Sequence, residues 1–280
     1  MTVNELKKFA TDVRIETVKC LEARTFGHIG GCLSIADVLT VLYNGELKNI
    51  DPADPKKLDR DMLVVSKGHA GPAVFATLAL KGYFPLDWLP TLCEGGTRLP
   101  SHCDRIRTPG IDASTGSLGQ GLSLANGFAH AAKIKNLKNR IYCLMGDGEI
   151  QEGQVWEAAM FAGFRKLDNL VVIVDNNGLQ IDGDIADVCS PYPIDKKFEA
   201  FNFHVINVAD GNDMDQLKAA FDEARATKGM PTAIIMKTVK GKGVSYMENA
   251  VGWHGKAPND EQYAQAMEDL EKVGEALCQK

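Results

Sequence analysis

The sequence lacks three features that would each assign it to a different class of protein. Its seven cysteines include no Cys-x-x-Cys pair, and an odd number cannot form a complete disulfide framework. His102, Cys103 and Cys93 have no fourth ligand at a usable spacing, so a zinc site is not predicted. No apolar run approaches the length of a membrane span, and the N-terminus has no apolar signal-peptide core. We therefore expect a cytoplasmic protein with reduced thiols and no membrane partner.

An excess of positive charge is also lacking. The chain has 31 Lys and Arg against 37 Asp and Glu, which gives a net charge of −6 and a pI of about 5.6. Binding to a nucleic-acid backbone requires a concentrated positive surface, so nucleic acid is not expected as a partner. At 280 residues, with 45% hydrophobic and 24% charged residues, the chain suits one large enzyme domain that spans residues 1–280.

Apolar strands alternate with amphipathic helices along almost the whole chain. This alternation predicts an α/β fold with a doubly wound, mainly parallel sheet flanked by helices. Ser34 is expected to cap one helix, and two polar segments, 49–60 and 95–112, are expected to be loops. The predicted strands cover residues 62–66, 140–145, 170–175, 203–208 and 232–237. The predicted helices cover residues 5–24, 70–80, 116–135, 154–166, 214–227 and 259–279, with another beginning after Ser34.

The segment from Gly146 to Gly183 contains two apolar strands that each end in an oxygen ligand. The first ends in Gly-Asp-Gly, which contains Asp147, and the second ends in Asp-Asn-Asn, which contains Asn177. The segment between them is long enough for the crossover helix of a right-handed βαβ unit, so both strand ends face one crevice. Glycine lets the backbone approach a phosphate closely, while carboxylate and amide oxygens suit Mg²⁺. These residues therefore predict a diphosphate site with a bound cation.

Gly-Asp-Gly followed about 30 positions later by Asn-Asn resembles the thiamin diphosphate motif. The longer segments 146–153 and 177–183 resemble the transketolase version of this motif. The resemblance implies that Asp147, Asn177 and the carbonyl of Leu179 hold Mg²⁺, with Ca²⁺ or Mn²⁺ as substitutes. The cofactor contacts that it implies in the first turn are Gly146, Asp147, Gly148 and Glu149.

Four of the six histidines lie beside glycine or in short loop motifs. Near neutral pH an imidazole donates or accepts a hydrogen bond, so a cluster of histidines can hold hydroxyls and relay protons. His130 and His204 lie within a predicted helix and a predicted strand, and we interpret both as structural. Three segments, Thr25–Gly31, Ser66–Ala70 and Ser114–Gly121, also resemble transketolases. The histidines that match the substrate channel of that family are His28, His69, His102 and His254.

The same resemblance implies a role for each of these residues. Gly116 and Leu118 would contact the aminopyrimidine of thiamin, and the glycine spacing around them differs from a dinucleotide-binding fingerprint. His69 would contact the diphosphate, with Lys242 as a neighbour. The residues implied to hold sugar hydroxyls are His28, His102 and His254, of which His254 also reaches the diphosphate.

Thiamin chemistry requires a glutamate that holds N1′ of the pyrimidine ring, and in transketolases this glutamate lies in a separate pyrimidine-binding domain. The resemblance covers residues from about 5 to about 260 but matches only the diphosphate-binding part of a full-length enzyme. We therefore expect a split transketolase whose second subunit carries the pyrimidine-binding and C-terminal domains, in an α₂β₂ assembly. Glu152 would face this subunit; alternatively, it is a carboxylate favoured by the positive end of a helix.

Two departures from the family pattern flank the expected sugar contacts. Ser101-His102-Cys103-Asp104 stands where Gly-His-Pro-Glu is common, and Ile29 stands where proline is common. The implied reaction transfers a two-carbon ketol unit from a ketose phosphate to an aldose acceptor, and these departures allow a branched, sulfonated or deoxy sugar. The alternatives are a 1-deoxyxylulose-phosphate synthase, a non-catalytic partner subunit of a thiamin enzyme, and a Mg²⁺-dependent phosphate-binding protein or hydrolase. The intact metal ligands argue against the second of these, and the histidines argue against the third.

Overall fold

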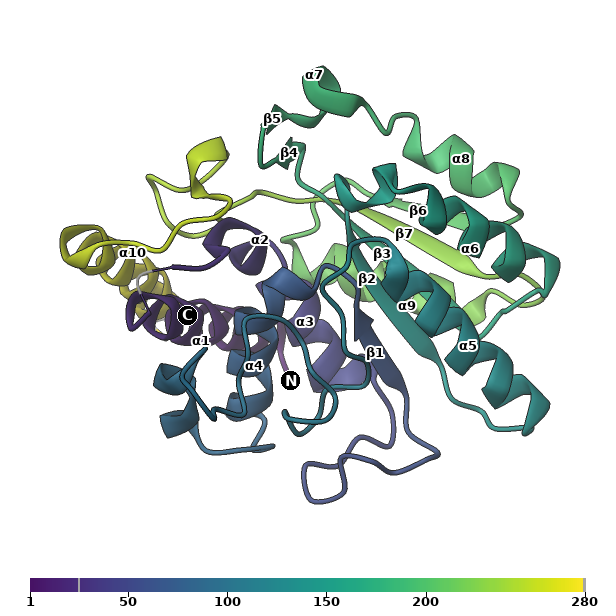
Figure 1. Cartoon of the computed structure of the whole chain (residues 1–280), viewed down its shortest axis with the longest axis horizontal. Coiled ribbons are helices and arrows are strands. Elements are labelled where there is room, and N and C mark those ends of the chain that lie inside the picture. Colours follow the sequence, from purple (N-terminus) through teal and green to yellow (C-terminus); the bar gives the residue numbers. More distant parts are fainter. Residues whose placement is uncertain (25, 279–280) are drawn as a thin grey trace.

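The computed structural model describes residues 1–24 and 26–278 of the chain. Thr25, in the first family-like segment, and Gln279, the predicted end of the last helix, lie outside the described residues. The centre of the molecule is a five-stranded parallel sheet in the order β1-β2-β3-β7-β6 (Figure 1). The strands are β1 (Met62–Val65), β2 (Ile141–Gly146), β3 (Leu170–Asn176), β6 (His204–Val208) and β7 (Thr232–Lys237).

Helices cover both faces of this sheet, because successive side chains of each strand point to opposite faces and both sets are apolar. On one face, Val64 and Cys143 share an apolar cluster with α5 (Gln120–Ile134), α6 (Gly153–Phe164) and α8 (Ile194–Ala200). On the other, Leu63 and Leu144 share a cluster with α1 (Val3–Glu22), α3 (Ala36–Val41), α4 (Gly71–Leu80) and α9 (Met214–Ala226). The predicted doubly wound α/β fold is therefore confirmed.

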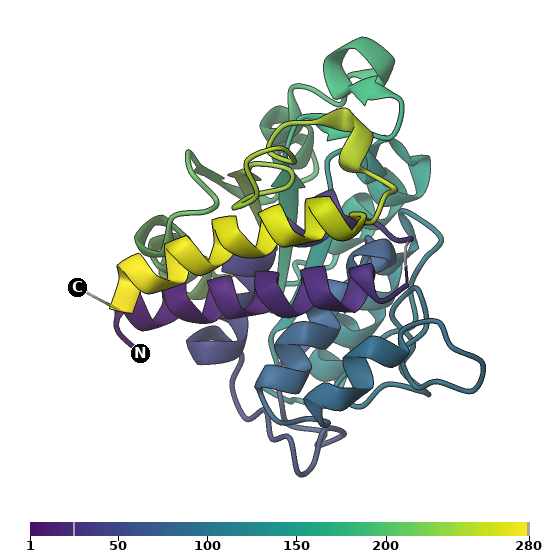
Figure 2. The same cartoon turned by 90° about the vertical axis from the view of Figure 1, so that its left-hand side faces the viewer.

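The last helix, α10 (Asp260–Cys278), packs along α1 although the two lie at opposite ends of the sequence (Figure 2). No helix among the described residues is long and apolar enough to cross a membrane, and the cysteines from Cys20 to Cys189 are all free. The remaining elements are short: α2 (Ile29–Leu33), η1 (Leu42–Glu46), η2 (Gly68–Ala70), η3 (Leu86–Thr91), η4 (Glu149–Gln151), β4 (Leu179–Gln180), β5 (Gly183–Asp184), α7 (Ile185–Cys189) and η5 (Val251–Trp253).

Two predicted helix starts are wrong, one because of local backbone geometry and the other because of a distant contact. Helix α5 begins at Gln120 and not at Gly116, since Gly116 and Gly119 have φ angles of 154° and 81°, which an α-helix does not allow. Ser34 does not cap the start of a helix. It follows the end of α2, and its hydroxyl donates a hydrogen bond to Asp175 at 2.7 Å.

The carboxyl ends of four strands meet at one edge of the sheet, and each strand continues into a polar segment. Lys67 follows β1, Asp147 follows β2, Asn177 follows β3 and Lys240 follows β7. Because the strands are parallel neighbours, these residues from distant parts of the sequence come to the same edge, where α/β proteins bind ligands. The predicted loops 49–60 and 95–112 contain no helix or strand, as expected.

Two helix glycines separate the effect of packing from that of helix propensity. A Cβ at Gly163 in α6 would lie 1.9 Å from the carbonyl oxygen of Phe201, whereas a Cβ at Gly127 in α5 would meet no atom within 4 Å. We predict that Gly163→Ala lowers the free energy of unfolding by about 1–3 kcal/mol, because the backbone must shift. Gly127→Ala should raise it by about 0.5–1 kcal/mol. Urea unfolding measures both free energies. If both substitutions changed the free energy of unfolding in the same direction, the packing of α6 on Phe201 would be contradicted.

Candidate functional site

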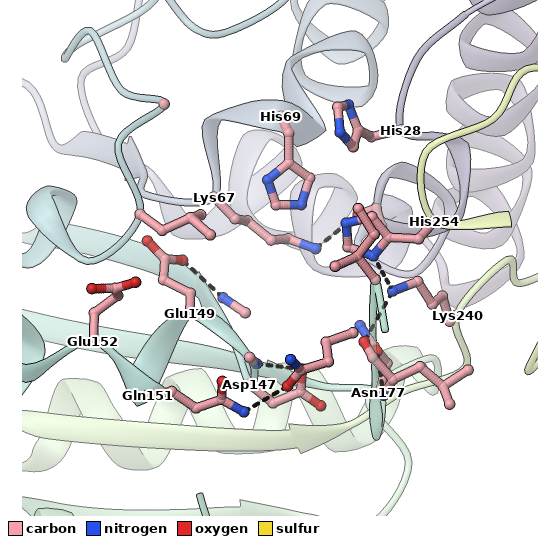
Figure 3. A pocket seen from close by; sticks show the side chains of 18 of the residues that line it. His28, Lys67, His69, Asp147, Glu149, Gln151, Glu152, Asn177, Lys240 and His254 are labelled. Atoms are coloured by element: carbon pink, nitrogen blue, oxygen red, sulfur yellow. Dashed lines mark hydrogen bonds between the residues drawn. The ribbon is translucent and has the colours of Figure 1, made fainter. Parts of the chain in front are cut away.

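A cavity of about 410 Å³ opens at the carboxyl edge of the sheet (Figure 3). Every site residue predicted from the sequence lines this cavity except Lys242, while His130 and His204 lie elsewhere on α5 and β6. Lys67, Gln180 and Lys240 also line it, although no sequence motif assigned them a role. The predicted residues that line it are His28, His69, His102, Gly116, Leu118, Gly146, Asp147, Gly148, Glu149, Glu152, Asn177, Leu179 and His254.

Lys242, predicted as a neighbour of the cofactor, lies outside the cavity, whereas Lys240 lines it. The ammonium of Lys242 forms a surface ion pair and lines a separate hollow. Lys240 is 1% exposed, and its ammonium donates to the carbonyl of Leu179 at 2.9 Å and to Nδ1 of His254 at 2.7 Å. The cause is Gly241, whose φ of 76° turns the chain between the two lysines.

Asp147 and Asn177 lie together on one side of the cavity, opposite the histidines (Figure 3). Asp147 is 2% exposed, and its two carboxylate oxygens accept hydrogen bonds from the N–H groups of Gly148 and Gly178, at 2.8 and 2.6 Å. Oδ1 of Asn177 accepts a hydrogen bond from the N–H of Leu179 at 3.1 Å. These contacts hold the predicted oxygen ligands in the two turns that follow β2 and β3.

The electrostatics around Asp147 and Asn177, a part of the cavity that we call the metal corner, fit a divalent cation. Burial raises the pKa of the Asp147 carboxyl to about 6, and the negative charge of Asp175 adds to the shift. A cation beside Asp147 would offset both effects. Within residues 1–24 and 26–278, no group of three or more His, Cys, Asp or Glu is arranged to hold a metal. A cation here would therefore rely on Asp147, the Asn177 amide, a carbonyl and ligand oxygens, a donor set that Mg²⁺ accepts.

Four histidines from separate segments gather on the other side of the cavity. The ring centroid of His28 lies 5.1 Å from that of His69, 6.3 Å from that of His102 and 5.7 Å from that of His254. Burial lowers the pKa of each ring, to about 2 for His69 and about 3 for His254, where neighbouring lysine ammonium groups add to the shift. The four rings are therefore neutral near pH 7, and each has one donor and one acceptor nitrogen. In His254 the acceptor, Nδ1, is already used by Lys240.

Glu149 forms hydrogen bonds to backbone and side-chain groups at the end of the cavity that the loop 116–119 forms. Its side chain is buried, and Oε1 accepts hydrogen bonds from the N–H of Gly119 at 2.9 Å and from the hydroxyl of Ser66. Oε2 accepts a hydrogen bond from the N–H of Gly146 at 3.0 Å. Because protein donors use both oxygens, this carboxylate joins three backbone segments around the cavity.

Leu118 and Glu152 form an exposed rim beside this loop. Leu118 is 39% exposed, and Glu152 is exposed at the residue that precedes α6. The carboxylate of Glu152 makes no capping hydrogen bond to the start of α6, so it does not serve as a helix cap. Both side chains are accessible to another chain.

The fold and the cavity define a class of protein: an α/β domain whose strand ends suit a diphosphate and whose opposite wall is made of neutral histidines. Comparison with known proteins gives the family. The model of the transketolase, thiamine diphosphate binding domain, matches residues 6–273. The chain therefore belongs to the transketolase family and corresponds to its thiamine diphosphate-binding domain.

Two of the following relatives are matched over nearly their whole length, and the third is matched over less than half of its length. The chain is 46% identical to the 6-deoxy-6-sulfo-D-fructose transketolase subunit SqwG of Clostridium sp. (strain MSTE9), over 96% of the chain and 98% of that protein. It is 40% identical to an apulose-4-phosphate transketolase subunit of Actinobacillus succinogenes, over 96% of the chain and 97% of that protein. The transketolase structure from Campylobacter jejuni superposes with a TM-score of 0.90 at 32% identity, over 99% of the chain and 46% of that protein. The chain thus spans about half the length of that transketolase.

Substitution of Asp147 tests the metal corner. We predict that Asp147→Asn lowers the affinity for thiamin diphosphate with Mg²⁺ by about 100-fold or more, because the ligand loses its charge. Asp187→Asn is the matched control, since Asp187 is exposed on α7 and does not line the cavity. Calorimetric titration of both variants measures the difference. Equal affinities in the two variants would refute the assignment of Asp147.

The lowered pKa of His69 predicts a loss of stability in acid. Above about pH 6.5 the ring is neutral in both the folded and the unfolded chain. Below that pH the unfolded chain takes up a proton that folded His69, with a pKa of about 2, does not, so stability falls by about 1.4 kcal/mol per pH unit. His69→Asn should therefore lose less stability than the wild type between about pH 7 and about pH 5. Urea unfolding at both pH values checks this prediction. Equal losses of stability in the wild type and in His69→Asn would contradict it.

Proposed function

We propose that this chain is the N-terminal subunit of a split transketolase, which transfers a two-carbon ketol unit from a ketose phosphate to an aldose acceptor. The observation that carries the proposal is that Asp147 and Asn177 line the same cavity as four histidines. Similarity over the full length of two transketolase subunits supports it. We also propose that residues 1–280 form one domain and that the protein works in the cytoplasm.

In this proposal the chain holds the diphosphate end of thiamin diphosphate. Asp147, Asn177 and the carbonyl of Leu179 bind Mg²⁺, and the glycine turn beside Asp147 lets backbone amides approach the phosphates. His69 and Lys240 meet the remaining charge of the diphosphate. When bound, thiamin diphosphate would supply the carbanion-stabilising chemistry that lets a bond between two ketose carbons break.

The histidine wall holds the sugar. His28 and His102 are neutral, so each can accept a hydrogen bond from one hydroxyl or donate to another without the cost of carrying a charge. His254 is also neutral, and because its Nδ1 accepts from Lys240, it donates to a hydroxyl through Nε2. Their rings lie close enough together to reach neighbouring hydroxyls of one substrate. They also stand within the same cavity as the metal corner, which orients the sugar toward the cofactor.

A second subunit completes the site in this proposal. The chain provides the diphosphate end, while the glutamate that holds the pyrimidine ring would come from a partner with the pyrimidine-binding and C-terminal domains, in an α₂β₂ assembly. Gly116, Leu118 and Glu152 would contact this partner, because they lie on the rim of the cavity. An obligate interface is typically apolar. Exposed apolar side chains also occur along α5 and α6, the two helices that begin at this rim: Leu124, Met160, Phe161 and Phe164.

An unusual sugar is the second candidate substrate, and two observations favour it. The relatives matched over their whole length are named for 6-deoxy-6-sulfo-D-fructose and for apulose-4-phosphate. In this chain, the hydroxyl of Ser101 lies 2.9 Å from Nδ1 of His102, so a residue that departs from the family pattern orients a proposed sugar contact. A branched, sulfonated or deoxy sugar would meet this altered pair, whereas its anionic group would be met mainly by the partner.

The proposal predicts that the purified chain is inactive alone. Without the partner, no glutamate reaches N1′ of the pyrimidine, so transfer of a two-carbon ketol unit should be undetectable even with thiamin diphosphate and Mg²⁺. Addition of the partner subunit should restore turnover. A coupled assay with a ketose phosphate donor and an aldose phosphate acceptor measures both states. Appreciable turnover by the isolated chain would refute the split-enzyme proposal.

A further inference from the structure

Asp175 is a buried carboxylate to which none of the roles above assigns a function. It lies near the end of β3, is 0% exposed, and accepts hydrogen bonds from four side chains. The ammonium of Lys67 and the hydroxyl of Ser34 lie 2.6 and 2.7 Å from its Oδ2, and the hydroxyl of Thr238 donates to its Oδ1. The fourth donor is the side-chain amide of Asn177, whose Nδ2 lies 3.1 Å from Oδ2.

The contact between Asp175 and Asn177 decides which end of the amide faces the metal corner. An amide carries one carbonyl oxygen and one NH₂ group, and only the oxygen can bind a cation. An ionised carboxylate accepts hydrogen bonds and donates none, so Asp175 holds the NH₂ group and turns Oδ1 away from itself. There Oδ1 accepts a hydrogen bond from the N–H of Leu179, and its second lone pair is left for a cation.

We propose that Asp175 is a positioning residue that orients the Asn177 amide, so that Oδ1 is presented to the metal of the diphosphate cofactor. This inference rests on the proposed function, because it requires a cation between Asp147 and Asn177. Lys67 supports the arrangement, since its side chain is 2% exposed and its ammonium also donates to the carbonyl of Gly31 at 2.7 Å. The charge of Asp175 is thus balanced inside the protein, and its oxygens are used by four donors and are not free to bind the metal.

The test uses the full chain, with Mn²⁺ as the metal probe read by electron paramagnetic resonance and thiamin diphosphate as the ligand. Asp175→Asn places a second amide against Asn177, so that the two groups no longer define one orientation. We expect the affinity for Mn²⁺ to fall about 10–100-fold, the range found when a partner of a metal ligand is changed. Thr238→Val is the matched control, because it removes another hydrogen bond to Asp175 and none to Asn177, and Thr238 does not line the cavity.

A reciprocal exchange separates positioning from a purely structural role. The double variant Asp175→Asn with Asn177→Asp keeps the net charge and restores a contact between an amide and a carboxylate. The oxygens of the new carboxylate at position 177 are equivalent, so one of them always faces the metal. We expect this variant to recover most of the affinity lost in the single variant. Asn177→Asp alone measures how much affinity a charged ligand adds at this position. If Asp175 served only as the counter-ion of Lys67, the double variant would gain no more over Asp175→Asn than Asn177→Asp gains over the wild type.

The outcomes distinguish this proposal from the proposed function. A wild-type chain that binds no Mn²⁺ with thiamin diphosphate would overturn the proposed function, and the role of Asp175 would fall with it. A wild-type chain that binds, with Asp175→Asn binding equally well or the double variant showing no recovery beyond the gain of Asn177→Asp alone, would overturn only the role of Asp175. An affinity loss in Thr238→Val as large as in Asp175→Asn would do the same.

Thermal unfolding without metal shows whether each variant folds. If Asp175→Asn does not fold, the wild-type protein still provides a test through the side-chain amide of Asn177, whose ¹⁵N signal is assigned by its loss in Asn177→Ser. Its NH₂ protons should exchange slowly with solvent both before and after metal is added, because Asp175 holds them throughout. Rapid exchange in the metal-bound state would overturn the proposal.

Discussion

The burial of Asp175 is the constraint on which the other features of the site depend. A carboxylate that is 0% exposed is stable only when its charge is paired and its oxygens accept hydrogen bonds. Ser34, Lys67 and Thr238 meet this requirement, and they come from a helix end, the end of β1 and the end of β7. Pairing one carboxylate therefore holds three distant segments at the edge of the sheet. His69 and the proposed metal ligands lie on or next to these segments, so the cavity depends on the same pairing.

Much of the fold could be predicted from the sequence, because each strand is a short apolar run covered on both faces. The predicted strand 232–237 coincides with β7, and the other strand bounds differ by a residue at most at either end. Helix starts were less predictable for physical reasons. The segment from Gly116 to Gly119 contains no proline that would exclude a helix, and the positive φ angles of Gly116 and Gly119 exclude it. Ser34 has the sequence signature of a helix cap, but its hydroxyl is taken by a carboxylate 141 positions away.

The candidate site was predictable where the motif itself determines the geometry. Asp147 and Asn177 follow strands that are neighbours in the sheet, so their proximity follows from the βαβ pattern. Lys240 could not be distinguished from Lys242 in this way, because the turn between them depends on distant contacts: the N–H of Gly241 donates to the carbonyl of Gly30 at 3.0 Å. The hydrogen bonds of the Glu149 carboxylate could not be predicted for the same reason, since Gly119 and Ser66, two of its donors, belong to other segments of the chain.

The two buried lysines give the site its electrostatic character. Burial, together with the charge of Lys67, lowers the pKa of Lys240 to about 8, so it is costly to hold the two ammonium groups together in the cavity. The same positive charges help to keep His69 and His254 neutral. A diphosphate carries the negative charge that would relieve the repulsion between the lysines, and a cation at Asp147 would relieve the repulsion between Asp147 and Asp175. Metal and diphosphate together would therefore offset repulsion between like charges, positive on one side of the cavity and negative on the other.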